Sequence, residues 1–340
     1  MFRQKSFRSS HTPVFFVVVC FLFILISAKY DYFINIGFSA PSGNSESCNI
    51  GPISTEPSST QVITSTPIST PTAVAFPEKI WYKVGPQGVS TEAESFRNHC
   101  LELSPSYEYE ILDDEMASAY VYKWFSDRPD IITTYFSLNV PILRADVLRY
   151  LILWAEGGMW MDLDVSCDEV PIHRWVLKEY REAANLVVGL EFDWPWENDN
   201  FLHAQFTSWT IMAKPRSPHM MQVIDDILVD IDEVARQHNV SIDGIQMSMI
   251  PQVVDLTGPK RMTRSIVKSL NRILERELDD RDITGLRSAK LVHDVLILPG
   301  NAFAASQSNF PKDQGPVLVT HHYAGTWKNK LGGEEGKTSV

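Results

Sequence analysis

An uninterrupted apolar run, VFFVVVCFLFILISA, occupies residues 14–28. About 20 apolar residues normally span a bilayer, and the aromatic residues that follow this run lengthen it through the interfacial layer. Basic residues precede the run whereas only Lys29 follows it closely, which places the N-terminus in the cytosol. The pattern predicts a cytosolic tail over 1–13 and a signal-anchor transmembrane segment over 14–33. The alternative is a cleaved signal peptide, whose apolar region reaches a similar length.

The pattern then changes to a segment dominated by Pro, Ser and Thr, as in STEPSSTQVITSTPISTPT. This segment lacks the apolar residues that build a core, so we interpret 34–75 as an extended, O-glycosylated stem. Whether the apolar run is an anchor or a cleaved peptide, the rest of the chain enters the secretory pathway. A globular domain is expected over 76–330, followed by a flexible tail over 331–340.

Segments with strand and helix character alternate through the globular part. Strands are predicted in EKIWYKV, YEYEILDD, MWMDLDV, LVVGLEF, QFTSWTIMAK, VLILP and PVLVTHHY, and helices in TEAESFRNHCLEL, 115–125, RADVLRYLILWAE, 218–236 and 260–277. Such alternation predicts an α/β fold with a mainly parallel sheet, which binds its ligands at the carboxyl ends of the strands.

Composition and charge narrow the choice of partners. The 340 residues are 44% hydrophobic and 21% charged, as in globular proteins, and the formal net charge is −12. No block of Lys or Arg stands out, so no nucleic-acid partner is expected. An anionic substrate would have to be held by a metal ion or by a few local cations. Among four cysteines, Cys100 and Cys167 fall in the globular part, where they either pair in an oxidising lumen or remain two buried thiols.

Two carboxylates, Asp162 and Asp164, close the apolar strand in GGMWMDLDV. In a continuing strand they would face opposite sides, so both address one ion only if the strand ends and turns there. Mg²⁺ and Mn²⁺ prefer carboxylate and phosphate oxygens, and such an ion can neutralise a diphosphate leaving group. A solvated turn is the alternative, but the apolar strand and the Gly157-Gly158 pair before it favour a functional site.

Asp146 and Arg149 lie three residues apart and therefore share one face of the predicted helix RADVLRYLILWAE. An exposed pair at this spacing would contribute only a few tenths of a kcal/mol to stability. The helix is otherwise largely apolar, which favours a charged pair that faces a ligand pocket.

Two histidines near the C-terminal end, His321 and His322, are candidates for the metal site. Adjacent residues of a strand point to opposite sides, so at most one of the two reaches an ion. The other would be a packed or exposed imidazole. Trp327 follows closely in YAGTWK and is either a residue of the site or part of the core.

Taken in order, these segments resemble glycosyltransferase family 32, and within it the fungal Golgi initiation-specific α-1,6-mannosyltransferases. The resemblance runs from Phe76 to Trp327 through SYEYEILDD, LRADVLRYLILWAEGGMWMDLDV, LVVGLEFD, QFTSWTIMAKPRSPHM, LTGP, DVLILP and HHYAGTWK. It implies a GT-A-type, Rossmann-like nucleotide-sugar transferase domain. It also implies a single-pass type II Golgi membrane protein with its catalytic domain in the lumen.

The resemblance further implies which residues form the site. Asp162 and Asp164 become the metal and diphosphate residues, joined by His321 or His322. The implied donor contacts are Asp146, Arg149, Trp81, Gly157, Gly158 and Trp327. Many family members begin with Ile-His-Gln-x-Trp where this chain has Ile80-Trp81-Tyr82-Lys83, so the resemblance does not carry over the contacts with the donor base. Asp193 is a candidate catalytic carboxylate on the acceptor side, with a loop carboxylate as the alternative.

The implied reaction is the transfer of mannose from GDP-mannose, with Mn²⁺ (or Mg²⁺), to an N-glycan or mannan acceptor with retention of configuration. Other branches of the family mannosylate inositol-phosphoceramide. A further alternative is a donor-binding, non-catalytic subunit of a mannosyltransferase complex, against which the intact acidic and basic site residues argue. Phosphatases of the haloacid-dehalogenase type also carry Asp-x-Asp after an apolar strand, but Gly-Thr usually follows it and Val165-Ser166-Cys167 follows here.

Overall fold

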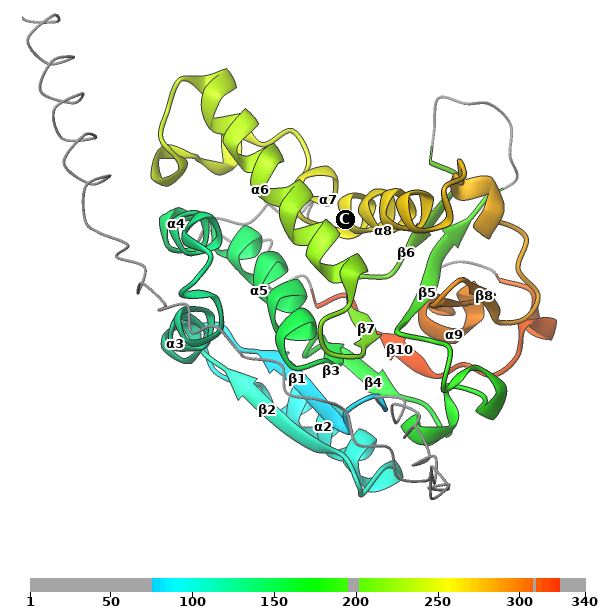
Figure 1. Cartoon of the computed structure of the whole chain (residues 1–340). Coiled ribbons are helices and arrows are strands. Elements are labelled where there is room, and N and C mark those ends of the chain that lie inside the picture. The colour runs from blue at the N-terminus through cyan, green and yellow to red at the C-terminus, as the bar shows by residue number, and fades with distance from the viewer. Residues whose placement is uncertain (1–74, 195–201, 308–309, 325–340) are drawn as a thin grey trace, which may run out of the picture. The chain divides into compact units, whose positions relative to one another are not determined.

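The computed structural model describes residues 75–194, 202–307 and 310–324 of the chain. These residues belong to one compact unit, 69–340, whose helices and strands are labelled in Figure 1. The predicted cytosolic tail, signal anchor and C-terminal tail, and nearly all of the stem, lie outside the described residues and stay predictions. Within the described ranges, no helix is both long and apolar enough to cross a membrane.

The strands are β1 Lys79–Lys83, β2 Glu108–Leu112, β3 Gly158–Met161, β4 Val165–Cys167, β5 Leu186–Asp193, β6 Ala204–Phe206, β7 Thr210–Ala213, β8 Lys290–Val292, β9 Val295–Leu298 and β10 Val319–His321. The α-helices are α2 Thr91–Leu103, α3 Asp114–Phe125, α4 Pro129–Ser137, α5 Pro141–Ala155, α6 Pro218–His238, α7 Val253–Leu256, α8 Pro259–Leu274 and α9 Gly300–Ala304. Helix α2 begins after the N-cap residue Ser90, whose side chain accepts a hydrogen bond from the Ala93 N–H.

Eight strands form one sheet in the order β2-β1-β3-β7-β5-β9-β8, with β6 paired to β5. The sheet is mixed, so the prediction of a mainly parallel sheet was wrong: β7 runs antiparallel to both β3 and β5. The segment QFTSWTIMAK, predicted as one strand, is split between β6 and β7. The described residues between β5 and β7 form β6 and no helix, and a parallel pair requires a crossover of a dozen or more residues, which usually form a helix.

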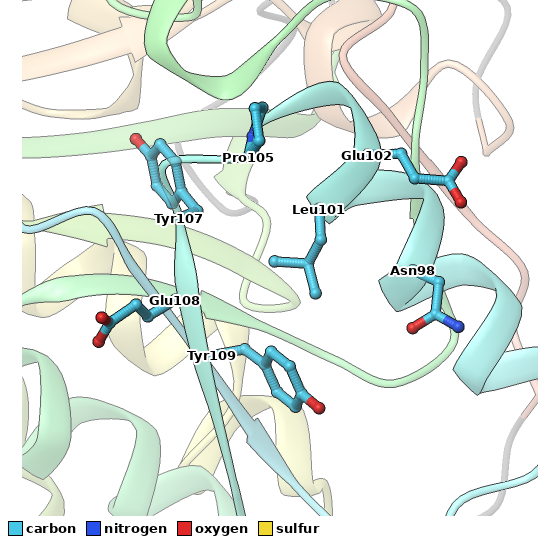
Figure 2. Close-up of a pocket in the computed structure, with 7 residues that line it drawn as sticks. All are labelled: Asn98, Leu101, Glu102, Pro105, Tyr107, Glu108 and Tyr109. Carbon is cyan, nitrogen blue, oxygen red and sulfur yellow. The ribbon is translucent and has the colours of Figure 1, made fainter.

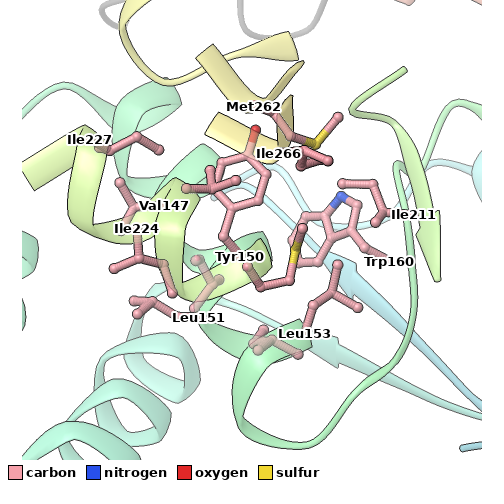
Figure 3. Close-up of a cluster of buried hydrophobic side chains, with 14 of the residues drawn as sticks. Val147, Tyr150, Leu151, Leu153, Trp160, Ile211, Ile224, Ile227, Met262 and Ile266 are labelled. Carbon is pink, nitrogen blue, oxygen red and sulfur yellow. The ribbon is translucent and has the colours of Figure 1, made fainter. Parts of the chain in front are cut away.

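Hydrophobic side chains fill both faces of the sheet, as the period-two pattern of its strands requires. Trp81 and Trp160 point into the larger core, which is closed by α3, α4, α5, α6 and α8. Figure 3 shows part of this core, where Trp160 lies near residues of α5, α6 and α8. Ile80 and Met159 point the other way, into a second core against α2 and α9. In Figure 1, α2 accordingly lies across the sheet from α5 and α6.

A disulfide joins Cys100 of α2 to Cys167 of β4, which decides between the two alternatives left open by the sequence. Strand β4 pairs antiparallel with β10 in a separate two-stranded sheet. This small sheet follows the Asp-x-Asp segment directly, so the disulfide fastens it to the helix that covers the main sheet.

Candidate active site

The carboxyl ends of β1, β2, β3, β5 and β9 lie at the same edge of the sheet. Strands β1, β2 and β3 are mutually parallel, and β3 and β5 are both antiparallel to the β7 strand between them. Strand β9 is parallel to β5. The Asp-x-Asp segment comes at the end of β3, so it lies at the edge where sheets of this kind bind ligands.

The polypeptide leaves β3 through a tight turn that contains both aspartates. The Asp162 N–H donates to the Trp209 carbonyl at 2.9 Å, and the Val165 N–H donates to the Asp162 carbonyl at 3.1 Å. The chain then enters β4. The predicted end and turn of the strand at this point is confirmed, and the two carboxylates are free from the strict alternation that would separate them.

Two glycines allow α5 to join β3 so closely. Gly157 and Gly158 have φ values of 69° and 93°, in the left-handed region. A Cβ on Gly157 would lie 2.7 Å from the Ala213 carbonyl oxygen, and one on Gly158 would lie 2.7 Å from that of Lys79. Both glycines therefore serve the backbone turn that positions β3, while their predicted contact with a donor stays a prediction.

Arg149 links the helix pair to the first aspartate of the turn. Its Nη2 lies 3.0 Å from Oδ1 of Asp146 and 3.5 Å from Oδ1 of Asp162. Its Nη1 donates to the Ser208 carbonyl at 2.6 Å, and the Thr257 hydroxyl donates to Asp146 at 2.7 Å. The Asp146 and Arg149 residues are only 4% and 5% exposed, so this is no surface ion pair. The pair lies behind Asp162, and its direct contact with a donor stays a prediction.

Two carboxyl groups, those of Asp146 and Asp162, thus face one guanidinium. Burial raises the pKa of Asp146 and of Asp162, although Arg149 opposes the rise in both. Burial alone would lower the pKa of Arg149, but Asp162 and Asp146 raise it above its usual value, so the guanidinium stays charged. The Trp160 indole N–H also donates to Oδ1 of Asp162 at 2.7 Å. A cation bound at Asp162 would lower this raised pKa, because an opposite charge stabilises the ionised carboxylate.

The two histidines point to opposite sides of β10, as predicted. His321 reaches the second aspartate, with Nε2 3.3 Å from Oδ2 of Asp164, and its ring stacks on Trp209 at 4.4 Å. Its Nδ1 is buried without a hydrogen-bond partner. His322 turns away, its Nε2 2.9 Å from the Ser166 hydroxyl and its ring stacked on Phe96. Of the two, His321 is the histidine beside the Asp-x-Asp turn.

Asp164 is held more firmly than Asp162. The Ala324 N–H donates to its Oδ2 at 2.9 Å, and the His322 N–H donates to its backbone carbonyl at 2.8 Å. Burial alone would raise the pKa of the Asp164 carboxyl, but His321 and the Ala324 N–H hold it below its usual value. Asp164 is therefore an anion across the physiological range, ready to bind a cation.

A divalent cation fits these residues as part of a site that a substrate completes. The hydrogen bonds from neighbouring groups engage Oδ1 of Asp162 and Oδ2 of Asp164, which leaves the other oxygen of each carboxylate for an ion. Within the described part of the chain, no three His, Cys, Asp or Glu side chains group to hold a metal by themselves. Mg²⁺ is commonly bound in this way, through one or two carboxylates, substrate phosphates and water.

Trp81 and Trp327 are the other two predicted donor contacts. The Trp81 side chain is 1% exposed, and its indole N–H donates to the Gly157 carbonyl at 2.9 Å. The structure thus gives Trp81 a role in the core behind the glycine turn, and this burial disfavours direct contact with a donor. Trp327 lies outside the described residues.

The sequence analysis missed a third carboxylate at this edge, Glu191 of β5. Its Oε2 accepts from the Gln205 amide at 2.7 Å and its Oε1 from the Gln307 amide at 2.9 Å. The predicted Asp193 instead accepts from the Gly285 N–H at 2.8 Å, which gives that carboxylate a role in holding a loop. Glu191 follows the five buried residues with which β5 begins. A carboxylate after a buried strand is the same pattern that predicted Asp162.

A shallow hollow of about 720 Å³ lies elsewhere, between α2 and the beginning of β2. Figure 2 shows its lining, which includes Leu101, Tyr107 and Tyr109. Because β2 is parallel to β1 and β3, its amino end lies at the edge of the sheet opposite to Asp162. The hollow is therefore not part of the Asp-x-Asp site.

Comparison with known proteins agrees with this site. Residues 90–181 match the family described as glycosyltransferase sugar-binding region containing DXD motif. The chain is 35% identical over 236 residues to the initiation-specific alpha-1,6-mannosyltransferase of Schizosaccharomyces pombe, a match that covers 66% of this chain and 57% of that protein. It is 26% identical over 286 residues to the Candida albicans protein of the same name, covering 75% and 72%.

A shorter match extends the comparison to another acceptor class. Over 69 residues the chain is 42% identical to inositol phosphoceramide mannosyltransferase 3 of Schizosaccharomyces pombe, which covers 20% of this chain and 18% of that protein. The match to the DXD family contains both aspartates of the turn and the Asp146–Arg149 pair behind them. Residues 90–181 of the chain are thus similar to the DXD-containing sugar-binding region of glycosyltransferases, and the chain spans a little over half the length of the Schizosaccharomyces pombe relative that it matches.

Proposed function

We propose that this protein is a metal-dependent α-1,6-mannosyltransferase of the GT-A type. It moves mannose from GDP-mannose to an N-glycan or mannan acceptor with retention of configuration. The observation that carries the proposal is the Asp162–Asp164 turn at the ligand-binding edge of the sheet, within the segment that matches the DXD family. Similarity to two proteins named initiation-specific alpha-1,6-mannosyltransferase supports the choice of sugar and linkage.

Each residue of the site has a part in the proposed reaction. The divalent ion, when bound, neutralises the charge that develops on the departing diphosphate. Asp162 and Asp164 hold it through their free oxygens. Arg149 keeps Asp162 in place and adds positive charge behind it, since its Nη2 lies between Asp146 and Asp162. His321 fixes the orientation of Asp164 through Nε2.

The proposed location is the Golgi membrane, with the catalytic domain in the lumen and the apolar segment 14–33 as the anchor. The apolar run and the Pro/Ser/Thr-rich segment after it support this topology. The Cys100–Cys167 disulfide supports an oxidising compartment, because structural disulfides are rare in the cytosol.

A second candidate function is mannosyl transfer to inositol-phosphoceramide. The observation in its favour is the 42% identity over 69 residues to an inositol phosphoceramide mannosyltransferase. That match covers a fifth of this chain, whereas the two α-1,6-mannosyltransferases match two thirds to three quarters of it. The acceptor is therefore the property that an experiment has to decide.

The test uses the full-length protein in detergent with GDP-mannose, Mn²⁺ and two acceptors offered in parallel, a high-mannose N-glycan and inositol-phosphoceramide. We expect mannose on the glycan, released by an α-1,6-specific mannosidase, and an α anomer by NMR. Transfer to the lipid alone would establish the second candidate. Transfer only from UDP-sugars would overturn the donor assignment.

The same assay tests the metal. We expect Asp162→Ala and Asp164→Ala to lower the turnover by about a thousandfold, because losing the ion removes several kcal/mol of transition-state stabilisation. EDTA should abolish transfer by the unaltered protein, and added Mn²⁺ should restore it. Full activity of either variant, or in excess EDTA, would disprove the proposed metal role.

A further inference from the structure

Glu191 lies at the edge of the sheet that carries the Asp-x-Asp turn. Strands β3 and β5 flank β7, so their carboxyl ends are separated by two strand spacings, roughly 10 Å. Thr210, the first residue of β7, pairs with Met161, the last residue of β3. Glu191 is near the end of β5, beyond its contacts with β7. Glu191 therefore belongs to the part of this edge that lies across β7 from Asp162.

A continuous set of contacts joins Glu191 to the second aspartate of the turn. The Gln307 amide that donates to Glu191 accepts in turn from the Tyr323 hydroxyl at 2.6 Å. The Tyr323 ring lies 3.9 Å from the ring of His321, centroid to centroid. His321 then reaches Asp164 through Nε2. Glu191 is thus connected to Asp164 through three intervening side chains.

Glu191 lacks the cationic partner that the ion-paired carboxylates of this protein have. Asp226 of α6, for example, has the Lys268 ammonium 2.6 Å away. Among the described residues, no Lys or Arg forms an ion pair with Glu191, whose two oxygens are held by neutral amides. Burial raises its pKa, which the two amides oppose. A partly buried carboxylate without a cation costs stability, which favours a role with a charged ligand.

We propose that Glu191 is a catalytic residue that faces the transferred sugar and stabilises the positive charge that develops at its anomeric carbon. This inference rests on the proposed function. The bond from that carbon to the diphosphate oxygen breaks, and its electron pair leaves with the diphosphate. The acceptor hydroxyl oxygen forms the new bond, and its proton passes to the diphosphate. Glu191 forms no bond; its fixed negative charge stabilises the transition state electrostatically.

The chain offers a control carboxylate outside the site. Glu191→Gln removes the charge and preserves the shape, and Asp226→Asn does the same at the carboxylate that pairs with Lys268. We expect Glu191→Gln to lower kcat by about 10²–10³-fold with the KM for GDP-mannose changed little. Asp226→Asn should retain kcat within about threefold, since its carboxylate has no part in this mechanism.

Two further measurements separate a catalytic from a structural role. We expect kcat of the unaltered protein to fall as pH drops through the pKa of Glu191, and this acid limb to disappear in Glu191→Gln. The rise in Tm on adding GDP and Mn²⁺ should be the same in both proteins, which shows that the donor site is intact. Glu191→Asp keeps the charge and should recover part of the kcat that Glu191→Gln loses. It also tests the proposal if Glu191→Gln fails to fold.

The proposal is overturned if Glu191→Gln keeps kcat within about threefold, or if its acid limb is unchanged. Failure of the proposed function has a different signature, because the unaltered protein would then not use GDP-mannose. In that case a panel of GDP- and UDP-sugars identifies the donor that is turned over, and the Glu191→Gln comparison is made with it. If no sugar nucleotide is turned over, both proposals fall.

Discussion

At the scale of single residues, Arg149 carries the positive charge of a site that contains three carboxyl groups. It is buried, and its contacts with Asp146, Asp162 and the Ser208 carbonyl all lie within 3.5 Å. Breaking a buried ion pair by removing one partner leaves the other charge uncompensated, at a cost of about 3–5 kcal/mol. The pair can therefore act in stability, in positioning Asp162, or in both.

We expect Asp146→Asn to lower the free energy of unfolding by about 3–5 kcal/mol and to reduce transfer, because Arg149 is then drawn to Asp162. The double variant Asp146→Asn/Arg149→Met removes both charges and should regain most of the stability. Its activity should stay low, since Asp162 has lost its buried support. Denaturant unfolding and the transfer assay on all three proteins provide the comparison. Recovery of both stability and activity in the double variant would mean that the pair is structural only.

The site residues differ in how far sequence could predict them. Asp162 and Asp164 were predictable because one short segment contains the two glycines of the turn, the apolar strand and both carboxylates. The sequence could not predict which of His321 and His322 lies beside the aspartates. The alternation of side chains along a strand predicts that the two point to opposite sides, but it does not predict which side faces Asp164. Glu191 also follows a buried apolar stretch, but its connection to the site runs through Gln307, far along the chain, and a local pattern does not indicate such a contact.

At the scale of elements, the small sheet of β4 and β10 holds the second half of the site. Strand β4 follows Asp164 directly, and β10 ends at His321. The Cys100–Cys167 disulfide is the covalent link between this sheet and α2, across a sequence separation of 67 residues. Closing a loop of that length in the unfolded chain is worth about 4 kcal/mol in the chain-entropy model.

We expect Cys100→Ser/Cys167→Ser to lower the free energy of unfolding by about 4 kcal/mol. At a temperature where the variant is folded, half-maximal activity should need more Mn²⁺, because the strand that follows Asp164 is less firmly held. Thermal unfolding and Mn²⁺ titration of the transfer rate measure the two effects. Adding a reductant should move the unaltered protein toward the variant and leave the variant unchanged. Equal Mn²⁺ dependence in both proteins would show that the disulfide contributes to stability and not to metal binding.

Sequence predicted the helices and the outer strands of the sheet more accurately than its centre. Helix α6 was expected over 218–236 and occupies Pro218–His238, because one apolar face runs along it. The segment QFTSWTIMAK is rich in aromatic and β-branched residues, and it contains no Gly or Pro that would mark the break at Thr207–Trp209. That break is fixed by distant partners, since the Thr207 N–H donates to the Gly189 carbonyl and the Trp209 carbonyl accepts from Asp162.

At the scale of the whole molecule, stability at acid pH depends on a carboxylate far from the site. Asp294, in the turn between β8 and β9, accepts from Asn185 at 2.9 Å and contacts His219 and His293 at 2.8 and 2.7 Å. Burial alone would raise the pKa of Asp294, but these partners hold it well below its usual range. The stability that it contributes is complete above its unfolded pKa of about 3.9 and is lost as pH falls below that value.

We expect Asp294→Asn to be less stable than the unaltered protein at pH 7, and the difference to shrink as the pH falls below about 4. Below that value Asp294 takes up a proton in the unfolded state of the unaltered protein, and this uptake stabilises the unfolded state. The variant has no carboxylate at this position and therefore shows no such effect. Urea unfolding at a series of pH values between neutral and acid measures the difference. A difference that stays constant across the series would show that Asp294 does not titrate on unfolding.

Donor choice can also be measured on the whole molecule without an acceptor. A ligand that binds only the folded state stabilises it by about 2.7 kcal/mol at a hundred times its Kd. We expect GDP with Mn²⁺ to raise the Tm more than UDP with Mn²⁺ at equal concentration, and neither to act in EDTA. In Asp164→Ala the GDP shift should disappear, because the ion that neutralises the diphosphate would have lost one of its two proposed carboxylate ligands. Equal shifts from GDP and UDP would show that the site holds the diphosphate and does not select the base.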